Sequence, residues 1–318
     1  MGNKFRALNL EPFDLTKKHI SLTQKIESDL FGEDVEVYIK REDLLHEFVS
    51  GNKIRKLKYN LLQAQEENHH TVLTFGGAFS NHISAVSYAC KAMKLSSIGV
   101  IRGEELGDKI QHNPTLSFAH QNGMLLEFVS REIYRQKNSE ELLQKLKQKF
   151  GDFYVVPEGG TNELAVRGCE EILTDQDDIF DYLCCAVGTG GTISGIINSS
   201  KSHQKVLGFP ALKGDFLEGE VQKHTQKHNW KLIKDYHFGG YAKINRELVS
   251  FINEFKQQTD IPLDPVYTAK MCYGVSDLTR KNYFEKGTKI LLIHTGGLQG
   301  IEGMNQRLQQ QNLPKINV

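Results

Sequence analysis

The stretch Asp181-Tyr182-Leu183-Cys184-Cys185-Ala186-Val187-Gly188-Thr189-Gly190-Gly191-Thr192-Ile193-Ser194-Gly195 decides the fold of this chain. The apolar run that ends at Val187 predicts a buried β-strand, and the glycines after it predict a tight turn into a helix beginning near Thr192. Converging backbone N–H groups and the positive end of the helix dipole favour an anion there, so the turn predicts a phosphate-binding site. A glycine turn that serves packing alone is the alternative.

The glycine spacing argues against the two common nucleotide-binding motifs. The dinucleotide fingerprint requires a third glycine where Ile193 stands, and the lysine of the P-loop is absent. No acidic residue directly follows the next apolar run, 205–209, so a nicotinamide oxidoreductase is disfavoured. The histidines show no metal-ligand spacing, and we expect no metal site.

A second glycine turn follows the apolar run 71–75 and reads Gly76-Gly77-Ala78-Phe79-Ser80-Asn81-His82. Either Ser80 or Asn81 is placed to cap a following helix. A cap explains one polar side chain but not three in succession, so a ligand carboxylate or hydroxyl facing this turn is the rival interpretation.

A third segment, Ser50-Gly51-Asn52-Lys53-Ile54-Arg55-Lys56-Leu57-Lys58, gathers four cations in the first turns of a predicted helix. These charges oppose the helix dipole, so some group must compensate them. A lysine that condenses with an aldehyde loses its charge, and a nearby phosphate offsets the other cations.

Strand-length apolar runs alternate with segments of helical spacing, which is the pattern of a mostly parallel sheet covered by helices. The predicted strands are 35–40, 71–75, 97–101, 124–128, 153–156, 181–187, 205–209, 231–236 and 289–294. Nine strands and 318 residues favour two sheets and about two domains. Helices are predicted from Lys53 to near Asn68 and at 139–150, 216–228, 243–258 and 299–311.

Composition limits the class of partner. Lys and Arg total 39 and Asp and Glu also total 39, so no net positive charge recruits nucleic acid or anionic lipid. The odd number of scattered cysteines favours a reducing compartment, and the segment from Met1 to Arg6 lacks the apolar run of a signal peptide. We expect a soluble cytoplasmic protein that binds a small molecule, without nucleic-acid or membrane partners.

Together these segments resemble the pyridoxal-phosphate enzymes of the tryptophan-synthase-β fold type (fold type II). More narrowly, the chain is similar to the family of 1-aminocyclopropane-1-carboxylate deaminase and D-cysteine desulfhydrase. The matching stretches run in family order: 38–43, 51–57, 76–82, 157–162, 188–192, 263–270 and 294–297. The resemblance implies an α/β fold of two open twisted sheets, a larger domain of residues 1–53 and 161–318, a smaller inserted domain of 54–160, pyridoxal 5'-phosphate between them, and a homodimer.

The resemblance also implies roles for individual residues. Lys53 would bond to the cofactor's aldehyde and then move the substrate's α-proton. Asn81 would contact the phenolic oxygen, and the backbone of Gly188 to Thr192 would hold the phosphate. Ser80 would contact the substrate carboxylate or assist proton transfer. Tyr241 and Tyr267 would face the substrate, although a half-buried core tyrosine is the alternative for each.

Two further cofactor-contacting positions bear on the reaction. Ring-opening deaminases of the family have Glu and Leu where this chain has Thr268 and Thr295, which resemble the desulfhydrase branch. A hydroxyl at the cofactor's ring nitrogen gives a shallower electron sink than a carboxylate does. A shallow sink is sufficient for elimination, because the thiolate that leaves from Cβ takes the electrons with it. We therefore expect α,β-elimination on a small thiol amino acid, giving pyruvate, ammonia and hydrogen sulfide.

Two alternatives stay open, a 1-aminocyclopropane-1-carboxylate deaminase and a cofactor- and amino-acid-binding protein with little turnover. The sequence departs from the family pattern at Ser50, Phe79, the Gly240-Tyr241-Ala242 run and the Leu298-Gln299-Gly300 run. All four departures are expected to surround the substrate rather than the cofactor.

Overall fold

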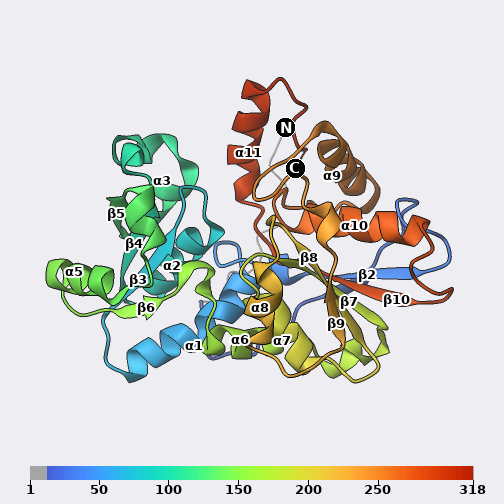
Figure 1. The fold of residues 1–318 in the computed structure, drawn as a ribbon, viewed down its shortest axis with the longest axis horizontal. Coiled ribbons are helices and arrows are strands. Elements are labelled where there is room, and N and C mark those ends of the chain that lie inside the picture. Colours follow the sequence, from blue (N-terminus) through green and yellow to red (C-terminus); the bar gives the residue numbers. More distant parts are fainter. Residues whose placement is uncertain (1–12, 318) are drawn as a thin grey trace.

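The computed structural model describes residues 13–317 and contains two β-sheets with helices on both faces of each (Figure 1). The predicted α/β fold with two mostly parallel sheets is confirmed. The segment Met1–Arg6, on which the sequence analysis drew, lies outside the described residues. No helix within residues 13–317 combines the length and the apolar character needed to cross a membrane.

The larger sheet has six strands in the order β1-β2-β10-β7-β8-β9, and every neighbouring pair is parallel except β1 with β2. The parallel arrangement places the carboxyl ends of five strands along one edge. The strands are β1 (Thr23–Lys25), β2 (Glu36–Lys40), β7 (Tyr182–Val187), β8 (Lys205–Pro210), β9 (Trp230–Leu232) and β10 (Lys289–Ile293).

The smaller sheet has four strands in the order β5-β4-β3-β6, all parallel. Its strands are β3 (Thr71–Gly76), β4 (Ser96–Arg102), β5 (Leu125–Val129) and β6 (Tyr154–Val156). All four lie within the predicted insertion 54–160, whereas the boundaries of that insertion stay a prediction.

Eleven α-helices and five short 3-10 helices connect the strands within residues 13–317. The α-helices are α1 (Asn52–Glu66), α2 (Asn81–Ala92), α3 (Pro114–Gln121), α4 (Arg131–Arg135), α5 (Glu140–Phe150), α6 (Glu163–Glu170), α7 (Gly191–Ser199), α8 (Phe216–Gln222), α9 (Arg246–Thr259), α10 (Thr268–Arg280) and α11 (Gly300–Gln310). The 3-10 helices are η1 (Glu42–Leu44), η2 (Glu104–His112), η3 (Glu158–Gly160), η4 (Asp175–Ile179) and η5 (Lys234–Tyr236).

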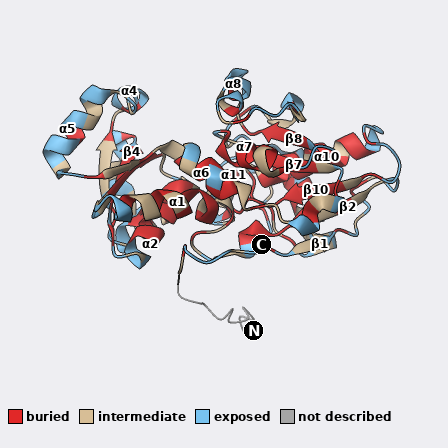
Figure 2. Ribbon diagram, turned by 90° about the horizontal axis from the view of Figure 1, so that it is seen from below, coloured by how far each residue is buried: buried red, intermediate tan, exposed pale blue. Residues whose placement is uncertain are grey.

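Each sheet is sealed by apolar side chains on both faces. Helices α9, α10 and α11 cover one face of the larger sheet, and α6, α7 and α8 cover the other. Helices α1, α2 and α3 pack on one face of the smaller sheet, with α4 and α5 opposite. Figure 2 shows the central strands of both sheets as buried and the outer helices as partly exposed. Burial of this apolar surface is the main stabilising contribution to the fold.

Some predicted elements are corrected by the structure. The run 231–236 is not one strand, because β9 ends at Leu232 and η5 follows it. The predicted helix 216–228 ends at Gln222, where the chain turns toward β9. The strand β1 was not predicted, since three residues with little apolar character give no periodic signal. Helix α10 was also not predicted, although its less buried side chains, Tyr273, Asp277 and Arg280, recur at helical spacing along one face.

Candidate active site

The predicted site residues follow the carboxyl ends of strands in both sheets. The turn after β7 carries the glycine run, the turn after β3 leads to Ser80, and Thr295 follows β10. Ligands of open parallel sheets bind at this edge, because the connecting loops and helix N-termini converge there. The arrangement brings two sheet edges to one region of the molecule.

Lys53 lies in the first turn of α1, directly beside the end of β10. The preceding Gly51 has a φ of +64°, and a Cβ added there would lie 1.9 Å from the carbonyl oxygen of Thr295. The backbone N–H of Asn52 donates to that same carbonyl at 3.2 Å. Only glycine permits this approach, which fixes where the lysine side chain begins.

Two hydrogen bonds connect Lys53 to the glycine turn. The Lys53 Nζ donates to Asn52 Oδ1 at 3.0 Å, and Asn52 Nδ2 donates to Thr192 Oγ1 at 2.7 Å. Burial, and secondly the charge of Lys56, lower the pKa of Lys53 from 10.5 to about 7. The amine and the start of α7 therefore face the same region, and a large share of the amine is uncharged near neutral pH.

The start of α7 has the chemistry of a phosphate site. Gly190 adopts a left-handed conformation with a φ of 89°, and α7 begins at Gly191 with its first N–H groups free of helical partners. A Cβ added at Gly191 would lie 2.9 Å from Thr161 Oγ1 and 3.3 Å from Lys56 Nζ. Backbone N–H groups, hydroxyls and an ammonium group thus surround the turn, and these donors fit the phosphate of pyridoxal phosphate.

Lys56 is a site residue that sequence analysis did not single out. Its buried Nζ donates to Gly159 O and Thr161 Oγ1, each at 3.0 Å, and lies 3.4 Å from Thr189 Oγ1. Within residues 13–317 no carboxylate pairs with this ammonium group. Desolvation lowers its pKa, so an anion at the turn would relieve a buried charge.

The remaining cations of α1 are compensated by protein carboxylates. Arg55 Nε donates to Glu42 Oε2 at 2.9 Å, and Lys58 Nζ donates to Glu171 Oε2 at 2.8 Å. The predicted need for compensation is confirmed for these two cations. Of the four cations, Lys53 and Lys56 are therefore the two that form no ion pair with a carboxylate within residues 13–317.

Ser80 and Asn81 stand at the start of α2. Ser80 is the N-cap, and its Oγ accepts a hydrogen bond from the N–H of Ile83 at 3.3 Å. The Asn81 side chain approaches the loop that follows β10 of the larger sheet. A Cβ added at Gly297 in that loop would lie 2.7 Å from Asn81 Nδ2. Capping therefore occupies a lone pair of Ser80, and its hydroxyl proton stays available to a ligand.

The two predicted tyrosines lie together beside the glycine turn. A Cβ added at Gly188 would lie 3.0 Å from Tyr267 Cε1, and the rings of Tyr241 and Tyr267 are 6.2 Å apart, edge to face. Tyr241 remains 46% exposed. Desolvation raises the pKa of both hydroxyls, so they stay protonated at neutral pH and act as hydrogen-bond donors.

The two threonines differ in their surroundings. Thr268 Oγ1 accepts from the N–H of Asp264 at 2.9 Å, as part of the turn that begins α10. Thr295 makes no side-chain hydrogen bond with residues 13–317, and its backbone supports the lysine segment. Of the two hydroxyls, that of Thr295 is the one left for a ligand.

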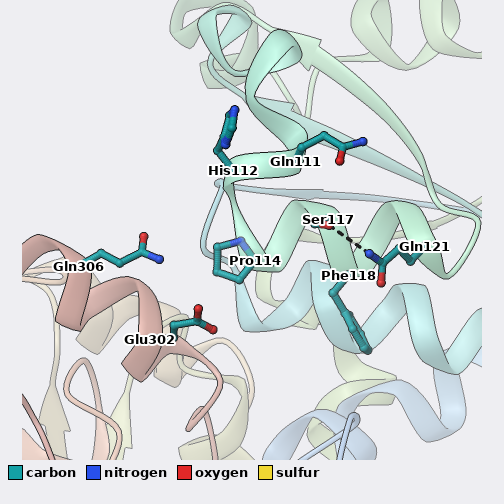
Figure 3. Close-up of a pocket in the computed structure, with 8 residues that line it drawn as sticks. All are labelled: Gln111, His112, Pro114, Ser117, Phe118, Gln121, Glu302 and Gln306. Carbon is teal, nitrogen blue, oxygen red and sulfur yellow. Dashed lines mark hydrogen bonds between the residues drawn. The ribbon is translucent and has the colours of Figure 1, made fainter.

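A separate surface depression of about 430 Å³ lies between the smaller sheet's helices and α11. Figure 3 shows Glu302 and Gln306 of α11 on one side and Pro114 and Ser117 of α3 on the other. None of the predicted site residues lines it. Within residues 13–317 no group of three or more His, Cys, Asp or Glu side chains is placed to hold a metal ion.

Comparison with known proteins identifies the family. Residues 16–296 match the family model described as pyridoxal-phosphate dependent enzyme. A putative 1-aminocyclopropane-1-carboxylate deaminase of Pyrococcus horikoshii is 33% identical, with 93% of each chain covered. A bifunctional, mitochondrial D-cysteine desulfhydrase/1-aminocyclopropane-1-carboxylate deaminase of Arabidopsis thaliana is 34% identical, with 84% of this chain and 73% of the relative covered.

A solved structure supports the same assignment. The crystal structure of an ACC deaminase homologue superimposes with a TM-score of 0.78 at 30% identity, covering 92% of this chain and 93% of that one. The sequence match, the fold and the donor set at α7 agree. The chain therefore belongs to the pyridoxal-phosphate-dependent enzymes, in the family that includes 1-aminocyclopropane-1-carboxylate deaminase and D-cysteine desulfhydrase.

Proposed function

We propose that this enzyme catalyses α,β-elimination on a small thiol amino acid, as a D-cysteine desulfhydrase does. The reaction releases hydrogen sulfide and aminoacrylate, and one water molecule then hydrolyses the aminoacrylate to pyruvate and ammonia. The observation that carries the cofactor-binding part of the proposal is the chain of two hydrogen bonds from Lys53 through Asn52 to Thr192. It supports a single ligand that spans the amine and the phosphate site at the start of α7.

Pyridoxal phosphate, when bound, supplies an aldehyde for the amine and an electron sink for the substrate's α-carbon. Lys53 Nζ, with its pKa near 7, takes up the α-proton, since it is largely unprotonated just above neutral pH. Lys56 and the first N–H groups of α7 bind the phosphate. The protonated hydroxyls of Tyr241 and Tyr267, whose rings lie 6.2 Å apart, would be the donors for the departing sulfur.

The choice of elimination over ring opening rests on hydroxyls in place of a carboxylate. Thr268 and Thr295 stand where ring-opening members of the family have Glu and Leu. A neutral hydroxyl at the ring nitrogen suits a substrate whose thiolate drains the electrons at once. Thr268 takes the place of the carboxylate, and its hydroxyl accepts from the N–H of Asp264. The Thr295 hydroxyl, which makes no side-chain hydrogen bond within residues 13–317, would be the one free to face the ring nitrogen.

Sulfide release from D-cysteine and from L-cysteine tests the proposal. Cofactor-loaded protein is expected to release sulfide and pyruvate in equal amounts from one enantiomer, and Lys53→Ala is the control that should release none. No sulfide from either enantiomer, with cofactor fully bound, would exclude the desulfhydrase reaction.

A 1-aminocyclopropane-1-carboxylate deaminase is the second candidate, favoured by the names of the relatives. Preferential formation of 2-oxobutanoate from 1-aminocyclopropane-1-carboxylate would establish it. A change in the cofactor's absorbance on adding amino acids, without any keto acid, would instead indicate a binding protein with little turnover. The cytoplasmic location and the homodimer stay predictions.

A further inference from the structure

The turn that carries Tyr241 has an unusual backbone. Phe238, Gly239 and Gly240 have φ values of 51°, 91° and 114°, and Ala242 has a φ of 53°. Two of these four residues are not glycine, so the left-handed conformation is unfavourable for them. A turn of this shape persists only where its surroundings hold it.

Lys270 of α10 holds one side of the turn. Its buried Nζ donates to His237 O and to Gly240 O, each at 2.8 Å. Within residues 13–317 no carboxylate forms an ion pair with it, and burial lowers its pKa to about 8. A buried cation that contacts only backbone carbonyls is costly to stability, and its evident use is to fix these two carbonyls.

Arg307 of α11 holds the other side. Its Nη1 donates to the carbonyl oxygen of Ala242 at 3.0 Å. The carbonyl groups of Gly240 and Ala242, the residues before and after Tyr241, are therefore each bound by a cation from a different helix.

Helix α10, which carries Lys270, also positions Tyr267. Helix α10 begins at Thr268, directly after Tyr267, whose ring packs against Gly188 and lies 6.2 Å from the ring of Tyr241. Lys270 stands two residues further along α10. Tyr267 is thus set by the start of α10, and Tyr241 is set relative to it through Lys270.

We propose that Lys270 and Arg307 are positioning residues that hold Tyr241 against Tyr267 at the substrate side of the active site. This inference rests on the proposed function only in assuming that Tyr241 faces the substrate. Neither cation needs to touch the substrate or the cofactor, since both act through backbone carbonyls.

Hydrogen exchange measured by mass spectrometry on cofactor-loaded protein tests whether Lys270 and Arg307 hold the turn that carries Tyr241. Lys270→Met and Arg307→Gln are expected to speed exchange of the Gly239, Gly240 and Lys243 amides by about tenfold or more, because these amides form the turn's hydrogen bonds. Wild-type protection of these amides in both variants would overturn the proposal.

Lys227→Met is a control for the hydrogen-bond pattern, because Lys227, although exposed, also donates to two backbone carbonyls, those of Asn198 and Ser200, away from the site. It is expected to leave the exchange of residues 237–243 unchanged. Faster exchange there in Lys227→Met would show a general loosening and would count against a specific clamp.

A double-mutant cycle tests whether Lys270 affects activity through Tyr241. Lys270→Met is expected to lower kcat/KM for D-cysteine by about tenfold to a hundredfold through misplacement of Tyr241. Lys270→Met combined with Tyr241→Phe should lose no more than the more impaired single variant, because the two residues act as one unit. Losses that multiply would overturn the positioning role.

The two proposals can fail separately. If the wild-type protein releases no sulfide, the cycle is measured on the apparent Kd for D-cysteine from the cofactor's absorbance change. Non-additive affinities there would support the clamp while the desulfhydrase reaction is rejected. If Lys270→Met is unstable, the double-mutant cycle is carried out with Arg307→Gln and Tyr241→Phe instead. Arg307 is only half-buried and binds the carbonyl of Ala242 on the other side of Tyr241.

Discussion

Four basic side chains leave the first turns of α1, and they have three kinds of environment. Arg55 and Lys58 pair with carboxylates, Lys53 bonds to an amide oxygen, and Lys56 is surrounded by hydroxyls and a carbonyl. Sequence analysis could identify Lys53 from its motif. It could not single out Lys56, whose partners lie 103 to 133 residues further along the chain.

Removal of the Lys56 charge should weaken cofactor binding. Hydrogen bonds to charged groups contribute about 1.5–3 kcal/mol, so we expect Lys56→Gln to raise the Kd for pyridoxal phosphate by about tenfold to a hundredfold. Titration of the cofactor-free protein by absorbance measures this change. Lys58→Gln is the control, because its Glu171 partner lies apart from the glycine turn; an equal loss in both variants would contradict a phosphate contact for Lys56.

At the scale of elements, sequence patterns predict the alternating strands and amphipathic helices well, and they predict short strands and largely buried helices poorly. The strand β7 and the start of α7 follow from an apolar run and a glycine turn. The start of α10 follows from no such pattern, because Asp264 organises it through three backbone N–H groups in an otherwise buried segment. Most residues of that helix are buried, and its partly exposed face is a narrow stripe of Tyr273, Asp277 and Arg280, which gives only a weak periodic signal in the sequence.

Ser80, the N-cap of α2, should contribute separately to the free energy of unfolding and to activity. Ser80→Ala is expected to lower the free energy of unfolding by about 1 kcal/mol, because the N–H of Ile83 loses its acceptor. Ser139 caps α5 through an equivalent bond to Leu142, so Ser139→Ala should cost about the same. Denaturant unfolding measures both. Only Ser80→Ala should also lower kcat/KM, and equal activity in the two variants would remove Ser80 from the substrate site.

The junction between the lysine segment and β10 should tolerate no side chain at Gly51. Gly51→Ala would place a methyl group 1.9 Å from Thr295 O, so the segment that carries Lys53 must move. Gly123→Ala is the matched control, since its φ is +86° but nothing lies within 4 Å of the added carbon. We expect about 1 kcal/mol of destabilisation from strain in Gly123→Ala, and loss of cofactor binding in Gly51→Ala alone. Spectroscopic cofactor titration of both variants provides the comparison.

At the scale of the whole molecule, buried lysines should make the cofactor-free protein more stable as pH rises from 7 to about 8.5. Lys53 and Lys270 have folded-state pKa values of about 7 and about 8, against 10.5 for an ordinary lysine. In this range the unfolded chain binds more protons, so stability increases with pH. Above it the effect is opposed, because buried thiols have raised pKa values and only the unfolded chain releases their protons.

Lys53→Met should reduce this pH dependence. We expect the variant to be more stable than the wild type at pH 7 by up to about 4 kcal/mol and to gain less between pH 7 and 8.5. Urea unfolding at several pH values measures both quantities. Identical slopes for the two proteins would contradict the lowered pKa of Lys53.

The five free cysteines are buried, one in the unit of the smaller sheet (Cys90) and four in the unit of the larger sheet (Cys169, Cys184, Cys185 and Cys272). A thiol-reactive dye therefore has no target until part of the structure opens. Pulsed alkylation followed by peptide mapping would time the opening of each half within one native sample. The chain thus carries its own set of reporters for the order in which its two halves come apart.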